Sequence, residues 1–255
     1  HHQPATSYQL HSSHHKHIHS ILSTPKHTAP EPLLTSSKNH SISAGIWLLA
    51  HLIATTIGLQ HIILSNIKTM SSIKSLPLDQ FLATLAAKQP TPGGGAAAAV
   101  GAAIGNAAAS MAAAYTTRKK DAESGAKEKA VALQSAMDVT EFLQAADDDA
   151  EAYADLQRTW KESVPEDEKA KIEARALAIP TNLVETCHKN ILSIHGFLPH
   201  CNTNITSDAK VGIHTLAGAA RAAYQTVLVN SPPEEEKMRL QALLKEIRDV
   251  EDELL

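Results

Sequence analysis

The stretch Pro90-Thr91-Pro92-Gly93-Gly94-Gly95, followed by the alanine-rich run 96–115, decides the fold of this chain. Two prolines stop any preceding helix, glycines allow backbone angles that other residues avoid, and alanine is the strongest helix former. The pattern therefore predicts a loop that leads directly into a long helix. The free N–H groups and the partial positive charge at such a helix end suit a carboxylate, a phosphate or a developing oxyanion.

The rest of the chain after Met70 also predicts helices, because it contains no alternating β-branched run of strand length. Prolines, acidic first turns and capping residues divide it into segments. We expect helices over residues 78–87, 94–119, 124–160, 165–197, 207–229 and 234–254, the fourth kinked at Pro180 and the fifth capped by Ser207. The sequence therefore predicts an all-α fold, an antiparallel bundle of five or six helices.

Residues 1–69 differ in composition from the rest. They contain eleven of the fifteen histidines, one acidic residue and no arginine, and Met70 is the first methionine. We interpret residues 1–69 as a low-complexity, histidine-rich leader, either an extended gene model or disordered, and residues 70–255 as the folded domain. The alternative is a membrane anchor, because the apolar run 44–64 is about as long as a bilayer-spanning helix; polar residues interrupt it, and we expect no membrane association.

The composition of residues 70–255 excludes several classes of function. They carry 26 acidic and 19 basic side chains, which argues against nucleic-acid binding. Cys187 and Cys201 form no CxxC pair or disulfide framework, which fits a reducing compartment, so we expect a cytoplasmic protein. The histidines of this region have no zinc-site spacing, and we predict no metal site; they are His188, His195, His200 and His214.

Three further motifs accompany the glycine loop. They are Leu78-Asp79-Gln80-Phe81-Leu82, the acidic stretch Asp147-Asp148-Asp149-Ala150-Glu151-Ala152-Tyr153, and Asn202-Thr203-Asn204-Ile205-Thr206-Ser207-Asp208-Ala209. In this order and at these separations, the four motifs resemble the cyclodeaminase/cyclohydrolase family. That family comprises the C-terminal domain of formiminotransferase-cyclodeaminase and free-standing relatives, including methenyltetrahydrofolate cyclohydrolases. The resemblance covers most of residues 73–230.

The resemblance implies an enzyme of tetrahydrofolate one-carbon metabolism that needs no cofactor. Because no formiminotransferase-like segment precedes the domain, we expect a methenyltetrahydrofolate cyclohydrolase, which forms 10-formyltetrahydrofolate. One alternative is a formiminotetrahydrofolate cyclodeaminase, which releases ammonia. The other is a non-catalytic folate-binding or helical scaffold protein. The expected small-molecule partner is a folate, with or without a polyglutamate tail.

The acidic stretch supplies the candidates for catalysis. Successive helical residues turn by about 100°, so Asp147, Asp148 and Asp149 cannot all share one site. Asp149 and Tyr153 are four residues apart and lie on one face of a helix. The resemblance implies catalytic roles for Asp149, Asp147 and Tyr153, with Asp149 as the first candidate for proton transfer and Asp148 exposed.

The other motifs supply candidates for substrate binding. The resemblance implies a pocket at Pro92, Gly93, Gly94 and Gly95, and it adds Asn204 and Asp208, because an amide offers both donors and acceptors to a pterin ring. The cations 118–120 could bind a polyglutamate tail or stabilise the end of their own helix. They lie about 35 Å from the glycine loop along the expected helix, so only a neighbouring subunit or the tail itself could join the two places.

Small residues follow one face of the alanine-rich helix, with Gly101 and Gly105 four residues apart. Such a face permits close packing inside the bundle or between two subunits. Together with the charged amphipathic helix at the C-terminus, it leads us to expect a homodimer.

Overall fold

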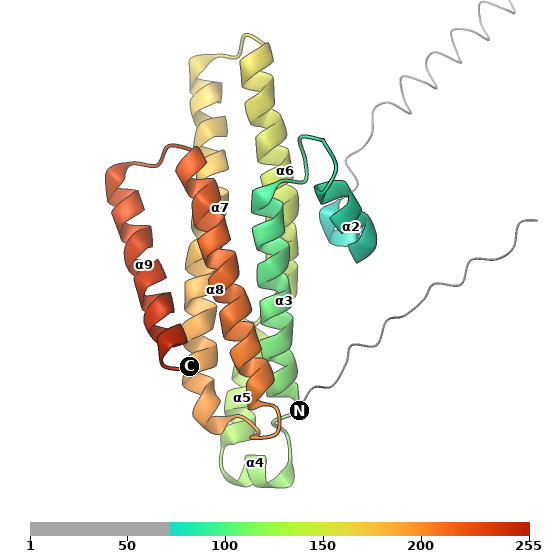
Figure 1. Ribbon diagram of the computed structural model, residues 1–255, viewed down its shortest axis with the longest axis vertical. Helices are drawn as coiled ribbons and strands as arrows, with labels where there is room; N and C mark the ends of the chain where they lie inside the picture. Colours follow the sequence, from blue (N-terminus) through green and yellow to red (C-terminus); the bar gives the residue numbers. More distant parts are fainter. Residues whose placement is uncertain (1–71) are drawn as a thin grey trace, which may run out of the picture. The chain divides into compact units, whose positions relative to one another are not determined.

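The structure is a computed structural model that describes residues 72–255. These residues form eight α-helices and two short 3-10 helices, with no strand among them, so the expected all-α bundle is confirmed (Figure 1). The histidine-rich leader predicted for residues 1–69 and the membrane anchor considered for residues 44–64 lie outside the described residues. The elements are η1 Ile73–Ser75, α2 Leu78–Leu85, α3 Gly94–Ala114, α4 Lys119–Glu123, α5 Ala126–Ala136, α6 Val139–Lys161, α7 Glu166–Phe197, η2 Leu198–His200, α8 Thr206–Val229 and α9 Glu234–Asp252.

The helix expected over residues 124–160 is two helices, α5 and α6, and this expectation was wrong. The chain turns between them at Asp138, whose side chain accepts a hydrogen bond of 2.7 Å from the backbone N–H of Thr140 and so caps α6. The sequence contains the pattern of a helix N-terminus here, because Asp138 is followed three residues later by Glu141 in the first turn.

Two helix ends also differ from expectation. The helix expected over residues 94–119 ends at Ala114, and a separate short helix, α4, follows it. Ser207 is not a cap, because α8 already begins at Thr206 and Ser207 lies inside its first turn. The polar side chain of Asn202 instead accepts the N–H of Asn204 before the helix starts. Local capping rules locate such ends only to within a residue or two.

Helices α3 and α8 form the centre of the bundle and run antiparallel. Gly101 faces Ala219 and Gly105 faces Gly212, so residue numbers rise along one helix as they fall along the other. A Cβ built at Gly105 would lie 3.0 Å from the carbonyl oxygen of Gly212 and 2.9 Å from Cγ of Leu216. Glycine at this position is therefore what lets the two backbones approach so closely.

By length and composition α3 could also cross a membrane. More than half of its most apolar window, 56%, is buried against other helices of the bundle. Its apolar character is therefore accounted for by its position in the core, where eleven of its residues are buried.

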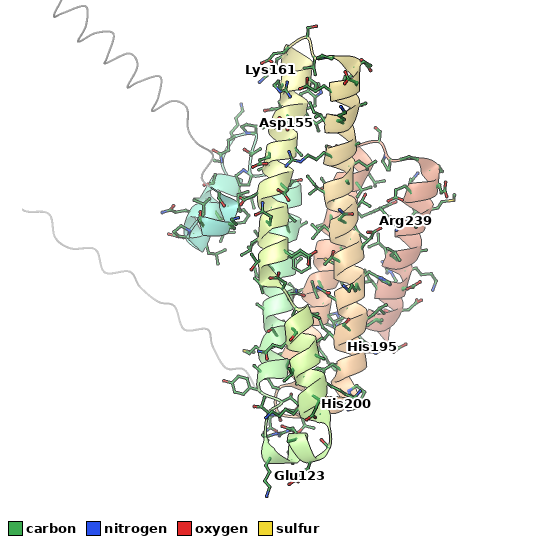
Figure 2. The ribbon with its side chains drawn as sticks, turned by 180° about the vertical axis from the view of Figure 1, so that it is seen from behind. Glu123, Asp155, Lys161, His195, His200 and Arg239 are labelled. Carbon is green, nitrogen blue, oxygen red and sulfur yellow. The ribbon has the colours of Figure 1, made fainter. Side chains whose placement is uncertain are left out.

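Helices α6 and α7 extend past the N-terminal end of α3 and the C-terminal end of α8 (Figure 1). Helix α9 packs against α7 and α8, and pairs of histidine and glutamate side chains join them. The pairs are His188 with Glu246, His195 with Glu253, and His214 with Glu251. Figure 2 shows His195 near the end of α7 and Arg239 on α9.

Helix α7 continues through the buried Pro180, which has no N–H to donate to the carbonyl of Ala176 one turn earlier. The side chain of Asn230, just after α8, supplies the missing donor. Its Nδ2 donates to the carbonyl oxygens of Ala176 and Thr226, each at 3.0 Å. Asn230 thus ties the end of α8 to the middle of α7.

We expect Asn230→Ala to lower the free energy of unfolding by about 1–2 kcal/mol, because it leaves a buried carbonyl without a donor. The loss should be smaller in a Pro180→Ala background, where the restored backbone N–H can bond to Ala176. Urea unfolding of the two single variants and the double variant measures this coupling. Equal losses in the two backgrounds would contradict the pairing of Asn230 with the proline gap.

Candidate active site

A cavity of about 930 Å³ surrounds the first turn of α3. The glycine loop and α3 form its floor, α6 forms one wall, and the C-terminal end of α8 forms the other, with one residue from α7. The volume is within the range of small-molecule sites. The lining residues are Pro90, Thr91, Gly93, Gly94, Gly95, Ala97, Ala98, Gly101, Asp149, Ala152, Tyr153, Leu156, Trp160, Ala176, Gly218, Ala219, Ala222, Gln225, Thr226, Val229 and Asn230.

Asp149 of α6 is the only charged side chain among these lining residues. Its Oδ2 accepts a hydrogen bond of 3.0 Å from the backbone N–H of Ala96, in the first turn of α3. The contact depends on Gly95, because a Cβ built there would overlap the carboxyl group, and even its farther oxygen would be only 2.8 Å away. The glycine loop therefore lets a carboxylate from α6 reach the end of α3.

Burial raises the pKa of Asp149, because the surrounding protein solvates the charged form less well than water does, while the hydrogen bond from Ala96 partly opposes this effect. No cation lines the described part of the cavity to offset the burial. A carboxylate with a raised pKa binds a proton more readily than an ordinary aspartate does, which makes Asp149 a candidate for acid–base chemistry.

An aromatic pair lies on the same face of α6 as Asp149. The rings of Tyr153 and Trp160 meet edge to face, with centroids 6.1 Å apart and planes at 83°. With Leu156 they line one wall of the cavity, and Trp160 is 65% exposed. Trp160 was not predicted from the sequence, although its spacing of eleven residues from Asp149 places both on one helical face.

The glycine loop and two of the three catalytic candidates meet at this cavity. Gly93, Gly94 and Gly95 line it beside Asp149 and Tyr153. Pro92 is buried next to the glycines but is not a lining residue. The polar groups that α8 contributes were not identified from the sequence; they are Gln225, Thr226 and Asn230. Their positions depend on how α8 crosses α3, which no local signal reports.

The structure does not bring Asp147 to the cavity. Its carboxylate accepts hydrogen bonds from the Ser72 hydroxyl, at 2.5 Å, and from the backbone N–H of Ile73, so it holds η1 against α6. Asp148 lies at the surface, where it accepts a hydrogen bond from Gln144 and lies 3.8 Å from Arg175. The three aspartates thus face three ways, as the helical geometry predicts.

Asn204 and Asp208 lie at the other end of the bundle from this cavity. The preceding Asn202 donates its side-chain N–H to the carbonyl of Tyr115, next to the C-terminal end of α3. Asp208 accepts a hydrogen bond from Ser207. In Figure 2, His200 and Glu123 lie near one end of the bundle and Lys161 at the other. Within one chain, the third motif is therefore separated from Asp149 by the length of α3.

The cations considered for a polyglutamate tail also lie at the end opposite the cavity. Arg118 forms a bidentate pair with Asp121 at 2.7 and 2.8 Å, which caps α4. Among the described residues, no group of three or more histidine, cysteine or acidic side chains is arranged to hold a metal ion.

The fold and this cavity define a class of protein, an all-α bundle with a cavity of small-molecule size that contains one partly buried carboxylate. Within that class, the chain belongs to the formiminotransferase-cyclodeaminase family, whose model matches residues 77–249. Membership places it among enzymes of folate one-carbon metabolism.

Solved structures share the fold. One of them is the crystal structure of formiminotetrahydrofolate cyclodeaminase from Thermotoga maritima, with a TM-score of 0.62 and 23% sequence identity, and the match covers 71% of this chain and 92% of that chain. No curated protein sequence matches the chain.

Proposed function

We propose that this protein is a formiminotetrahydrofolate cyclodeaminase, which converts 5-formiminotetrahydrofolate to 5,10-methenyltetrahydrofolate and ammonia. The observation that carries the proposal is the Asp149 carboxylate, partly buried at the floor of the cavity and bonded to Ala96 at the start of α3. The family and the similar solved structure are both named for cyclodeaminase activity, so we prefer it to the cyclohydrolase reaction expected from the sequence.

The reaction needs one group that takes a proton and gives it back. N10 attacks the carbon of the N5-formiminium group and forms a tetrahedral carbon bonded to N5, N10 and an amino group. In the proposed mechanism, the Asp149 carboxylate accepts the proton from N10 and delivers it to the amino nitrogen. The C–N bond then breaks, ammonia leaves, and the methenyl cation remains. A carboxylate with a raised pKa suits both halves of this relay.

The glycine loop supports the same chemistry in two ways. The first turn of α3 carries partial positive charge, which favours the ionised form of Asp149 and partly opposes the effect of its burial. The missing side chains at Gly93 and Gly94 leave room for the substrate against the loop. Because the relay moves only protons, we propose that it requires no cofactor, and a chelator should leave the rate unchanged.

Turnover of the full chain with two substrates tests the proposal. With 5-formiminotetrahydrofolate, we expect methenyl absorbance to appear together with stoichiometric ammonia, faster than in the uncatalysed reaction. With 5,10-methenyltetrahydrofolate, we expect hydrolysis no faster than the background. Hydrolysis without deamination would replace the proposal by the cyclohydrolase, and tight folate binding without either reaction would select a non-catalytic folate-binding protein.

The pH dependence of turnover should report Asp149. We expect kcat/KM for 5-formiminotetrahydrofolate to fall as pH falls through the raised pKa of Asp149, because only the ionised carboxylate can accept the N10 proton. The acid limb should lie above the ordinary aspartate pKa of about 3.9. The rate of the uncatalysed cyclisation is subtracted at each pH. A kcat/KM that stayed constant down to a pH of about 3.9, the ordinary aspartate pKa, would contradict this role.

We also propose that two copies of the chain associate through the open face of α3 and α8. Ile104 and Met111 of α3 and Val211 of α8 are large, apolar and exposed there. These faces run into the cavity wall at Gly101 and Gly218, and Asp208 of α8 is the charged residue closest to Val211 along the same face. An exposed apolar face with few charges is typical of subunit interfaces. Sedimentation equilibrium tests the proposal, which a strictly monomeric chain would contradict.

The expected compartment is also a proposal. Both cysteines, Cys187 and Cys201, are buried free thiols, and burial raises the pKa of Cys187 to about 12, so it is unreactive. Free thiols are typical of reducing compartments, and we propose the cytoplasm.

A further inference from the structure

We propose that Trp160 binds the aminobenzoyl ring of the folate by stacking at the mouth of the cavity, with the glutamate tail left in water. This inference rests on the proposed function, because it takes a folate as the ligand. It assigns a binding role to a residue outside the family-like motifs, and it gives the substrate a direction in the site.

The charge of the cavity sets that direction. A folate ends in a glutamate with two carboxylates, and burying them without cations is unfavourable. The only charged side chain among the described lining residues is Asp149, which is itself an acid. The glutamate therefore lies outside, at the exposed rim of the cavity, and the aminobenzoyl ring bonded to it lies just inside.

The exposed rim is where Trp160 lies. Its side chain lines the cavity and is 65% exposed, whereas Ala98 and Ala152 deeper in the lining are buried. The edge-to-face contact with Tyr153 orients the indole and leaves most of it uncovered. An exposed aromatic side chain at the edge of an apolar cavity is a platform for a planar ring.

The spacing along α6 fits the length of the substrate. Trp160 and Asp149 are eleven residues apart, or about 16 Å along the helix axis. With N10 at Asp149, the aminobenzoyl group bonded to it extends from the carboxylate along α6 toward Trp160. The reacting carbon is then placed at the carboxylate that relays its proton, while Tyr153 lies between the two positions.

Binding and kinetics of Trp160→Ala test the inference. With 5-formyltetrahydrofolate as an unreactive probe, we expect calorimetry to show binding weakened by about 10-fold, the order found when a stacking aromatic is removed. The KM for 5-formiminotetrahydrofolate should rise by a similar factor, with kcat within about 3-fold of the wild type. Trp160→Phe should recover most of the affinity, because it retains a ring. Met238→Ala on α9, which removes an apolar side chain of similar exposure, 57%, is the control.

Three results would overturn the inference. They are a Kd unchanged in Trp160→Ala, no binding of the probe to the wild type, and a loss of kcat in Trp160→Ala without loss of affinity, which would assign Trp160 to another role. The ring contact itself is visible as NOEs between indole protons and aminobenzoyl protons. These NOEs are assigned by their loss in Trp160→Phe. NOEs from the indole to the pteridine protons instead would reverse the proposed direction of the substrate. The two proposals can fail separately. If the wild type binds the probe but shows no turnover, and Trp160→Ala weakens that binding, the inference stands and the cyclodeaminase proposal fails.

Discussion

Asp149→Asn is expected to reduce kcat for the deamination of 5-formiminotetrahydrofolate by about 10²- to 10⁴-fold, the range for removing a general acid–base group. Asparagine has nearly the same shape, and its side-chain oxygen can still accept the hydrogen bond from Ala96. It cannot take the proton from N10. KM should therefore change little, and the loss should appear in kcat under saturating substrate.

Asp148→Asn is the matched control for this variant. It makes the same chemical change one position earlier, on a side chain at the surface that interacts with Gln144 and Arg175. A surface ion pair of this kind contributes about 0–1 kcal/mol, so both stability and turnover should remain close to the wild type. If Asp149→Asn turned over substrate as fast as the wild type, the Asp149 carboxylate would have no part in the mechanism.

Stability should change in the opposite direction to activity. The folded-state pKa of Asp149 is raised above its unfolded value, so its contribution to stability is fully present below the unfolded pKa and is lost as pH rises through the folded pKa. Above the folded-state pKa the ionised carboxylate thus destabilises the fold, and in that pH range Asp149→Asn should unfold at a higher urea concentration than the wild type. The difference between the two should shrink as the pH is lowered.

Gly95→Ala is expected to reduce turnover by about 10²-fold, although it removes no reactive group. The added Cβ would overlap the Asp149 carboxyl group and force it away from the end of α3. A displacement of about 1 Å at a reacting group can cost a factor of this size. The overlap should also lower the free energy of unfolding by about 1–3 kcal/mol, because helix and carboxylate are already in contact.

Two other glycine variants separate this overlap from a general effect of alanine. Gly196→Ala on α7 adds a methyl group where no atom lies within 4 Å, and it should raise stability by about 0.5–1 kcal/mol through helix propensity. Gly94→Ala is likewise free of contacts within the chain, but it borders the space proposed for the substrate, so its effect should appear in KM while its effect on kcat stays well below that of Gly95→Ala.

The double variant Gly95→Ala/Asp149→Asn gives the sharper result. If Gly95 acts by positioning the carboxylate, adding Gly95→Ala to Asp149→Asn should reduce the residual rate no further. Independent, multiplying losses would show that the glycine contributes something other than the placement of Asp149.

Parts of the site could be predicted from the sequence because they depend on local geometry. The loop at Gly93 to Gly95 and the helix after it follow from backbone preferences, and the shared face of Asp149 and Tyr153 follows from a spacing of four residues. The same rule applied to Trp160 would have placed it on this face. The separation of Asp147 from Asp149 was also legible, because neighbouring helical residues diverge.

Other parts could not be predicted because they depend on which helices cross and where. Three features depend on contacts between segments distant in sequence. Asp147 holds η1, and Asn204 and Asp208 lie at the far end of α3 from Asp149. Asn230 replaces the donor missing at Pro180. From the resemblance we expected the acidic stretch 147–153 and the asparagine-containing stretch 202–209 to contribute to one site. Within one chain the antiparallel path of α3 and α8 separates them.

The sequence by itself determined an all-α bundle, a glycine loop at the start of a core helix, and one helical face that carries a carboxylate and aromatic rings, since each of these follows from residues close together in the chain. Only the tertiary structure decided that α6 lies against the first turn of α3, where the absent side chain of Gly95 admits Asp149 and burial raises its pKa. The physical reason is that desolvation depends on everything packed around a group, and that environment is assembled from four helices far apart in the sequence.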